Sequence, residues 1–125
     1  MNFAELFSFE GRVGRARYAI VFVVSLLAFI LGATIIITAL EAILPKSNYD
    51  TVGKNNAVVY TAIILWLVPT FWIWAANIVK RFHDTNRPGA WFLIFLIPLV
   101  GAIAAVAMFL VPGTPAENQY GPPVA

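Results

Sequence analysis

Long apolar stretches alternate with short polar segments along this chain. The apolar stretches cover residues 18–40, 57–79 and 91–111, and none of them contains Asp, Glu, Lys, Arg or His. At about 1.5 Å per residue, each stretch forms a helix of roughly 31 to 35 Å, enough to cross a hydrocarbon core of about 30 Å. The pattern predicts an all-α integral membrane protein, a small bundle of three transmembrane helices in one domain. An arm, residues 1–17, precedes the first span, and a Pro/Gly-rich tail, residues 112–125, follows the third.

The third apolar stretch allows a second interpretation. Pro98 and Gly101 lie midway along it. A full crossing is the preferred prediction, and it takes the tail to the opposite side of the membrane from the arm. In the alternative, a helix broken at Pro98 and Gly101 re-enters and returns the tail to the side it came from, provided that neighbouring protein satisfies the freed backbone groups.

Composition excludes several classes of protein. Apolar residues make up 61% of the chain and charged residues 11%, unlike an ordinary cytosolic domain or a disordered chain. A net charge of +2 is too small for a nucleic-acid binder. The chain has no Cys and a single His, so we expect neither a disulfide framework, nor a metal site, nor a cofactor. The first span is longer than the apolar core of a signal peptide and is expected to remain as an anchor.

Basic residues predict the orientation. They flank the first span at its start and fill the loop between the second and third spans: Arg12, Arg15, Arg17, Lys80, Arg81 and Arg87. The segment between the first two spans, residues 41–56, has only Lys46 and Lys54. The positive-inside bias therefore predicts that the N-terminus and the 80–90 loop are cytoplasmic and that residues 41–56 face outward.

Polar side chains gather near the end of the second span. Asn77, Arg81 and Asp84 fall on one face if the helix continues, and Asn77 could then orient Arg81. His83 and Asp84 suggest a catalytic dyad, but helical neighbours point about 100° apart and no Ser or Cys nucleophile is near. The favoured interpretation is structural: Asp84 pairs with arginines of the arm, and His83 makes the pair sensitive to mild acid.

Within the spans, the few polar and aromatic residues have structural interpretations. Trp66 is too deep in its span to be an interface anchor and is expected to pack between helices. Ser25, Ala28 and Gly32 share one helix face, where small side chains let two backbones approach closely.

Four motifs resemble those of a known family. In chain order they are Gly11-Arg12-Val13-Gly14-Arg15 with Tyr18; Arg81-Phe82-His83-Asp84-Thr85 with Trp91; Ile97-Pro98 with Gly101; and Pro112-Gly113 with Asn118-Gln119-Tyr120-Gly121. The set is similar to the signature of the small bacterial inner-membrane proteins called the domain of unknown function 805 family. The resemblance implies a compact helical inner-membrane protein without an assigned activity, and it supplies no catalytic residues. Motifs that act together are easiest to understand on one membrane face, which favours the re-entrant alternative.

The leading hypothesis is a non-enzymatic module whose cytoplasmic-face cluster binds an anionic lipid headgroup, a membrane-protein partner or a second copy of the chain. The alternatives are a subunit of an oligomeric transporter or channel and, less favoured, a lipid-modifying enzyme that uses His83 and Asp84. The candidate binding or structural residues are Arg12, Arg15, Arg17, Asn77, Arg81, His83, Asp84, Arg87, Asn118 and Tyr120.

Overall fold

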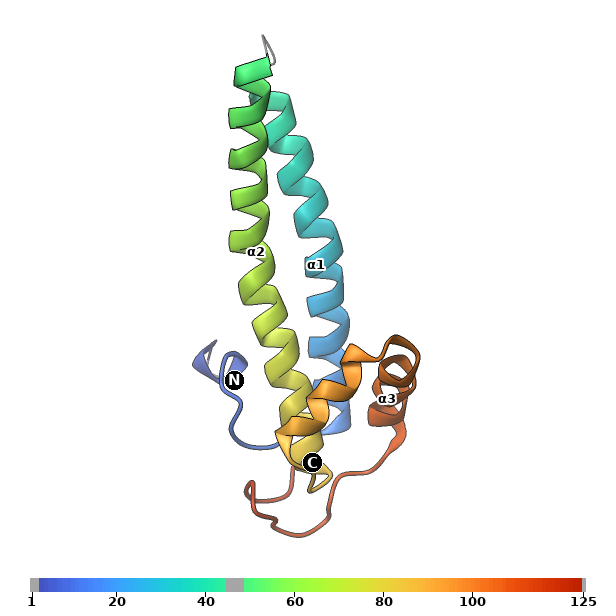
Figure 1. Ribbon diagram of the computed structural model, residues 1–125. Helices are drawn as coiled ribbons and strands as arrows, with labels where there is room; N and C mark the ends of the chain where they lie inside the picture. Colours follow the sequence, from blue (N-terminus) through green and yellow to red (C-terminus); the bar gives the residue numbers. More distant parts are fainter. Residues whose placement is uncertain (1–2, 45–48, 125) are drawn as a thin grey trace. The chain divides into compact units, whose positions relative to one another are not determined.

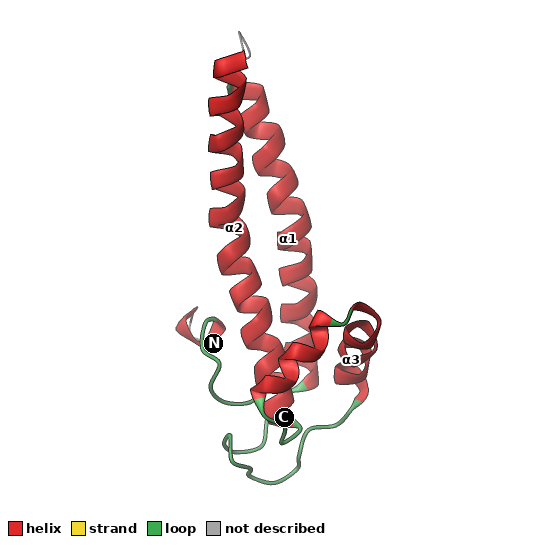
Figure 2. Ribbon diagram, viewed as in Figure 1, coloured by secondary structure: helices red, strands yellow, loops and turns green. Residues whose placement is uncertain are grey.

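The computed structural model describes residues 3–44 and 49–124 of the chain. Its elements are a short 3₁₀ helix η1 (Phe3–Leu6), α1 (Arg15–Ile43), α2 (Tyr49–Asp84), a 3₁₀ helix η2 (Gly89–Leu96) and α3 (Pro98–Leu110) (Figure 1). No β-strand occurs in these two ranges, and the connections are loops and turns (Figure 2). The predicted all-α class is confirmed.

The helices α1 and α2 extend beyond the charge-free stretches that predict them. The helix α1 ends at Ile43 and α2 begins at Tyr49, so the loop predicted over residues 41–56 is shorter than expected. Polar residues at these ends, such as Glu41 in α1 and Asn56 in α2, continue the helices. Lys46, which enters the orientation argument, lies outside the described residues, and Lys54 falls in the first turns of α2.

The third apolar stretch is not one helix. Ile97 is extended (φ −99°, ψ 104°) between η2 and α3, so the continuous helix predicted over residues 91–111 is wrong and the predicted break at Pro98 is confirmed. The cause is local, because the ring of Pro98 disfavours a helical conformation in the preceding residue. Only 13 residues remain in α3, about 20 Å of helix against a hydrocarbon core of about 30 Å. Within residues 3–44 and 49–124, two helical segments are long and apolar enough to cross a membrane: α1 and the Asn56–Asp84 part of α2.

Two compact units divide the described chain. The first contains Met1–Val23 and Ile73–Ala125, and the second contains Val24–Trp72. The core of the first unit is aromatic and aliphatic, and Phe22, Trp74, Phe92, Phe95 and Phe109 pack around a buried centre of Val13, Tyr18, Ile78, Phe82 and Met108. Arg81 and Asp84 belong to the same unit as this core, and both are buried, so their side chains have little access to water.

The second unit exposes its large apolar side chains. Leu31, Ile35 and Leu65 are each more than half exposed, which is typical of a surface in contact with lipid. Trp66 packs between the helices as predicted: its indole Nε1 donates a hydrogen bond to the Ala28 carbonyl oxygen at 3.1 Å. Gly32 permits this contact, since a Cβ atom at that position would lie 2.2 Å from the indole nitrogen.

Candidate functional site

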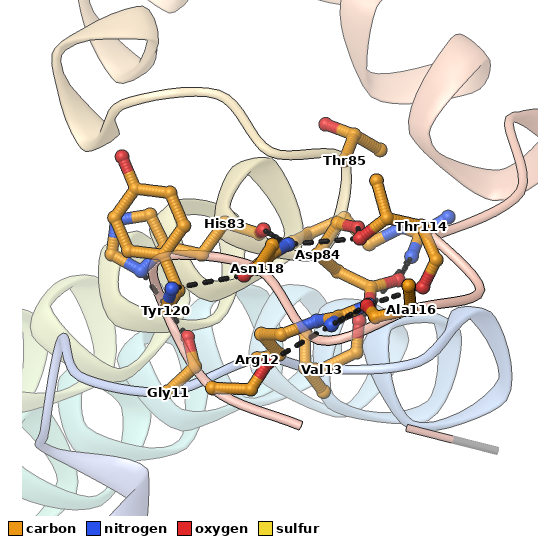
Figure 3. Close-up of polar contacts among 12 residues, drawn as sticks. Gly11, Arg12, Val13, His83, Asp84, Thr85, Thr114, Ala116, Asn118 and Tyr120 are labelled. Atoms are coloured by element: carbon orange, nitrogen blue, oxygen red, sulfur yellow. Dashed lines mark hydrogen bonds and ion pairs between the residues drawn. The ribbon is translucent and has the colours of Figure 1, made fainter. Parts of the chain in front are cut away.

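Asp84, the last residue of α2, holds two arginines with its carboxylate. Arg12 Nε donates to Oδ1 at 3.0 Å, and Arg81 Nη1 donates to Oδ2. All three side chains are buried, and Arg81 is fully so. Figure 3 shows Arg12 and Asp84 among the residues of this site. The predicted pairing of Asp84 with an arginine of the arm is therefore confirmed. We refer to Arg12, Arg81 and Asp84 as the Arg–Asp cluster.

The end of α2 fixes the position of Asp84. Asn86 has a left-handed conformation (φ 57°). The amides of Asn86 and Arg87 donate to the carbonyl oxygens of His83 and Phe82 at 3.0 and 2.9 Å. This double hydrogen bond is a Schellman motif, a common way to end a helix when a residue adopts positive φ. The carboxylate of Asp84 is thus presented by the last helical turn.

The arm brings Arg12 to the carboxylate through a turn at Gly11. Gly11 has φ +84°, which glycine adopts without steric cost. Two residues later, the amide of Val13 donates to the Lys80 carbonyl oxygen at 3.3 Å. The arm is therefore tied to the last turns of α2 on both sides of Arg12.

The two arginines also donate to backbone carbonyl groups of α3 and the tail, and Arg81 Nη1 donates to the Val13 oxygen of the arm at 3.3 Å. Arg12 Nη1 donates to the Ala116 and Gly121 oxygens at 2.9 and 3.1 Å, and Nη2 donates to the Thr114 oxygen at 2.6 Å. Arg81 binds carbonyl oxygens near the end of α3, where the helix dipole favours a cation: those of Met108, at 2.9 Å, and Val111.

These bonds place the tail beside the arm. This arrangement differs from the preferred expectation, in which a continuous third helix carries the tail away from the arm. The physical reason is the break before Pro98, where the extended Ile97 ends one helix and a second, shorter helix begins.

The tail also binds the backbone at the end of α2. The amide of Thr114 donates to the Asp84 carbonyl oxygen at 2.8 Å. Asn118 Nδ2 donates to the His83 carbonyl oxygen at 3.0 Å, and Asn118 Oδ1 accepts from the Tyr120 amide at 2.9 Å. Gly113 is required for this approach, because a Cβ atom there would lie 2.1 Å from Asp84 Oδ2.

His83 does not form a dyad with Asp84. Its ring stacks on Tyr120, and Nδ1 lies 3.2 Å from the Gly11 carbonyl oxygen. No hydrogen bond joins the imidazole to the Asp84 carboxylate in the part of the chain that the structure describes. His83 lies beyond the charge-free stretch 57–79, and burial lowers its pKa, while the Gly11 carbonyl opposes this shift. The carboxylate is occupied by guanidinium groups and is not available as a partner for the imidazole.

The other predicted residues have separate roles. Asn77 does not orient Arg81; its amide nitrogen donates to the Tyr18 carbonyl oxygen at 3.1 Å. Arg17 pairs with Glu5 at 3.1 Å on the surface. Arg15 and Arg87 are exposed. The structure thus unites six of the predicted residues in one place: Arg12, Arg81, His83, Asp84, Asn118 and Tyr120.

Two contributors were not among the predicted site residues. Lys80 is 8% exposed, and its ammonium donates to the Glu5 carbonyl oxygen at 2.5 Å. Thr114 bonds to Asp84 through its amide and its hydroxyl. The sequence offered one indication that Thr114 belongs to the site, its position directly after Pro112-Gly113. Nothing in the sequence distinguished Lys80 from a surface lysine.

Sequence relatives cover the whole of this arrangement. The family described as "Protein of unknown function (DUF805)" matches residues 6–122. The chain belongs to this family. Two Escherichia coli (strain K12) relatives are similar to it. Inner membrane protein YhaI is 33% identical over 114 residues, and inner membrane protein YhaH is 31% identical over 115; each alignment covers 91% of this chain, with 86% of YhaI and 84% of YhaH. No solved structure matches the chain.

The family match includes every residue of the Arg–Asp cluster and of the tail that binds it. Both relatives are named as inner membrane proteins, and two helices of this chain are long and apolar enough to cross a membrane. Together these observations support a helical membrane protein of a family whose function is unknown.

Proposed function

We propose that this chain is a non-enzymatic membrane module that binds anionic lipid headgroups at the membrane boundary. The observation that carries the proposal is a division among the arginines. Arg12 and Arg81 are buried and bound by the protein itself. Arg15 and Arg87 remain on the surface. The exposed pair, rather than the buried pair, is available to an external anion.

The surroundings of Arg15 suit a lipid phosphate. It is the first residue of α1, just before the charge-free stretch that begins at residue 18. Its one hydrogen bond in the described chain is a long one, 3.5 Å from Nη1 to the Leu110 oxygen. A guanidinium has five N–H donors in a fork that matches phosphate oxygens, so most of the donors of Arg15 are left for a ligand.

Arg87 lies against an aromatic side chain typical of a membrane interface. Its guanidinium carbon is 5.2 Å from the ring centre of Trp91. Tryptophan concentrates at the level of the headgroups, and a cation held on its face is in position for a phosphate there. Both exposed arginines therefore favour contacts at the membrane surface.

The proposal includes a topology. In it, α1 and α2 cross the inner membrane, and η2 with α3 forms a re-entrant segment. The arm, the 80–90 turn and the tail share the cytoplasmic side. The shortness of α3, the bonds from Arg12 to the tail and the six basic residues near this face support it. Reporter fusions test it: a fusion after residue 125 should report a cytoplasmic location and one within 45–48 an external location. A tail reporter on the external side would overturn the topology.

The same contacts support a role without catalysis. The carboxylate of Asp84 is held by two guanidinium groups, and the imidazole of His83 is covered by Tyr120. General acid–base work needs a group that is free to exchange a proton with a substrate, and the two arginines occupy the carboxylate of Asp84. The charge-free stretches also offer no ionisable group for ion-coupled transport.

Lipid retention tests the binding role. The protein is equilibrated with phosphatidylglycerol and phosphatidylcholine of equal chain length and examined by native mass spectrometry. The double variant Arg15→Gln/Arg87→Gln should retain at least about tenfold less phosphatidylglycerol, because each arginine supplies a charge-assisted contact. Lys54→Gln removes the same type of charge at the other end of α2 and should leave retention unchanged. Equal retention by the double variant and the wild type would remove the support for this function.

A further inference from the structure

A small cavity lies between the arm and the last turns of α2. Its volume is about 200 Å³. Apolar side chains form one part of its wall, and two of them, Val21 and Ile73, belong to the charge-free stretches. The polar part of the wall includes Lys80 and Glu10. The cavity therefore extends from hydrocarbon-facing residues to charged ones within one unit of the protein.

The charges of the cavity wall are not all balanced internally. Arg12 is paired with Asp84, and Arg17 is paired with Glu5. The Glu10 carboxylate forms no ion pair in the part of the chain that the structure describes. Lys80 forms no ion pair there either. Its ammonium donates one hydrogen bond, to the Glu5 carbonyl oxygen. One positive and one negative group therefore line the cavity without an ionic partner.

Lys80 is unusual because its charge is buried. The side chain is more than nine-tenths buried, and an ammonium has three N–H donors. A buried cation with one hydrogen bond is costly unless a further acceptor is supplied. An anionic group entering the cavity would supply that acceptor.

We propose that this cavity binds the headgroup of a zwitterionic phospholipid that carries a primary ammonium. The phosphate accepts from the Lys80 ammonium, and the headgroup ammonium donates to the Glu10 carboxylate. The glyceryl and upper acyl carbons lie against Val21 and Ile73. A phospholipid fits because it is the ligand class that joins both charges to an apolar chain. The inference rests on the proposed function only for the position of these residues at the membrane boundary.

Competition among lipids tests the assignment. Purified protein is equilibrated with phosphatidylethanolamine and phosphatidylcholine of equal chain length, and the bound lipids are counted by native mass spectrometry. The wild type should prefer phosphatidylethanolamine by about tenfold, because a trimethylated ammonium cannot donate a hydrogen bond to Glu10. Equal retention of the two lipids would overturn the proposal.

Two variants and one matched control assign the residues. Glu10→Gln, at an exposed position, should abolish the preference for phosphatidylethanolamine. Lys80→Gln should weaken binding of both lipids by about tenfold. Glu117→Gln, which removes an exposed carboxylate away from the cavity, should leave the preference unchanged. An unchanged preference in Glu10→Gln would overturn the proposal even if Lys80→Gln does not fold.

Two further measurements distinguish this cavity from the exposed arginines and from a site for a soluble ligand. Arg15→Gln/Arg87→Gln should lose phosphatidylglycerol but keep the preference for phosphatidylethanolamine, so the two proposals fail independently. Water-soluble glycerophosphoethanolamine carries the same headgroup without acyl chains. If it binds as tightly as the lipid, the cavity is a site for a soluble ester, and the assignment to a lipid is overturned.

Discussion

The phenol ring of Tyr120 lies flat over the imidazole ring of His83, with the ring centres 3.8 Å apart and the planes 2° apart (Figure 3). On the same imidazole, Nδ1 lies 3.2 Å from the carbonyl oxygen of Gly11. His83 therefore contacts the tail with its face and the arm with its edge. Both segments therefore contact one titratable side chain.

The first prediction concerns pH. Burial lowers the pKa of His83 in the folded protein, so the unfolded chain, with an ordinary histidine pKa of about 6.5, takes up a proton first as the pH falls. The free energy of unfolding contributed by His83 should be constant above about pH 6.5 and should decrease below it, towards the folded-state pKa. Thermal unfolding in detergent between pH 7.5 and 5.5 measures this loss.

His83→Gln is the control for the pH experiment, because glutamine keeps a hydrogen-bond donor and does not titrate in this range. Its unfolding temperature should depend less on pH than that of the wild type over the same interval. Parallel pH profiles for the two proteins would contradict an acid-sensitive His83.

The second prediction concerns Asp84→Asn. The change leaves the buried guanidinium groups of Arg12 and Arg81 without a counter-charge. Removing one partner of a buried ion pair costs about 3–5 kcal/mol, so we expect a loss of that order in the free energy of unfolding, measured by denaturant titration in detergent. Glu117→Gln removes an exposed carboxylate and should change stability by no more than about 0.5 kcal/mol. Similar losses in both variants would contradict a special role for Asp84.

The third prediction concerns Gly113→Ala. A methyl group at this position would overlap the carboxylate of Asp84, whose Oδ2 and Cγ atoms would lie 2.1 and 2.6 Å away. Because Asp84 is fixed by two arginines, the tail must move, and we expect a cost of about 1–3 kcal/mol. Protease cleavage of the tail should become faster. Val124→Ala, at a 43% exposed position of the same tail, should leave cleavage unchanged, and unchanged cleavage in Gly113→Ala would show that the contact does not hold the tail.

The fourth prediction concerns Gly32→Ala in the second unit. Alanine in place of glycine ordinarily stabilises a helix interior by about 0.5–1 kcal/mol. Here the new methyl group would displace the Trp66 indole and break its hydrogen bond to Ala28. We expect a lower unfolding temperature instead. In a Trp66→Phe background the same change should be neutral or stabilising, and a destabilising effect of equal size in both backgrounds would refute the contact.

The sequence predicted the long helices well because their cause is local. A charge-free stretch of sufficient length has few alternatives to a helix in lipid. The third stretch allowed two outcomes, and the choice depends on tertiary packing. Gly101 lies so close to the backbone of Phe95 that a Cβ atom would come within 2.8 Å of its Cα. The pattern of apolar and polar residues does not predict this close packing of Gly101 against Phe95.

The candidate site was predictable only where both partners are side chains. Opposite charges suggested that Asp84 pairs with an arginine of the arm, and Arg12 is that arginine. The acceptors for the other guanidinium N–H groups are mostly backbone carbonyl groups, such as those of Thr114 and Met108. Every residue has a carbonyl oxygen, so the sequence could not distinguish these acceptors from others.

The bonds of Arg12 set an order for biosynthesis. Its acceptors at Ala116 and Gly121 follow it by 104 and 109 residues, and a ribosome adds about 5–20 residues per second. The arginine is translated before the residues that provide these acceptors, so its bonds to the tail cannot form until those residues have been made. Assembly of the arm finishes only after the last of these carbonyl groups has emerged. A chain that ends before residue 114 lacks all three tail acceptors of Arg12, and its arm keeps the bonds to the last turns of α2.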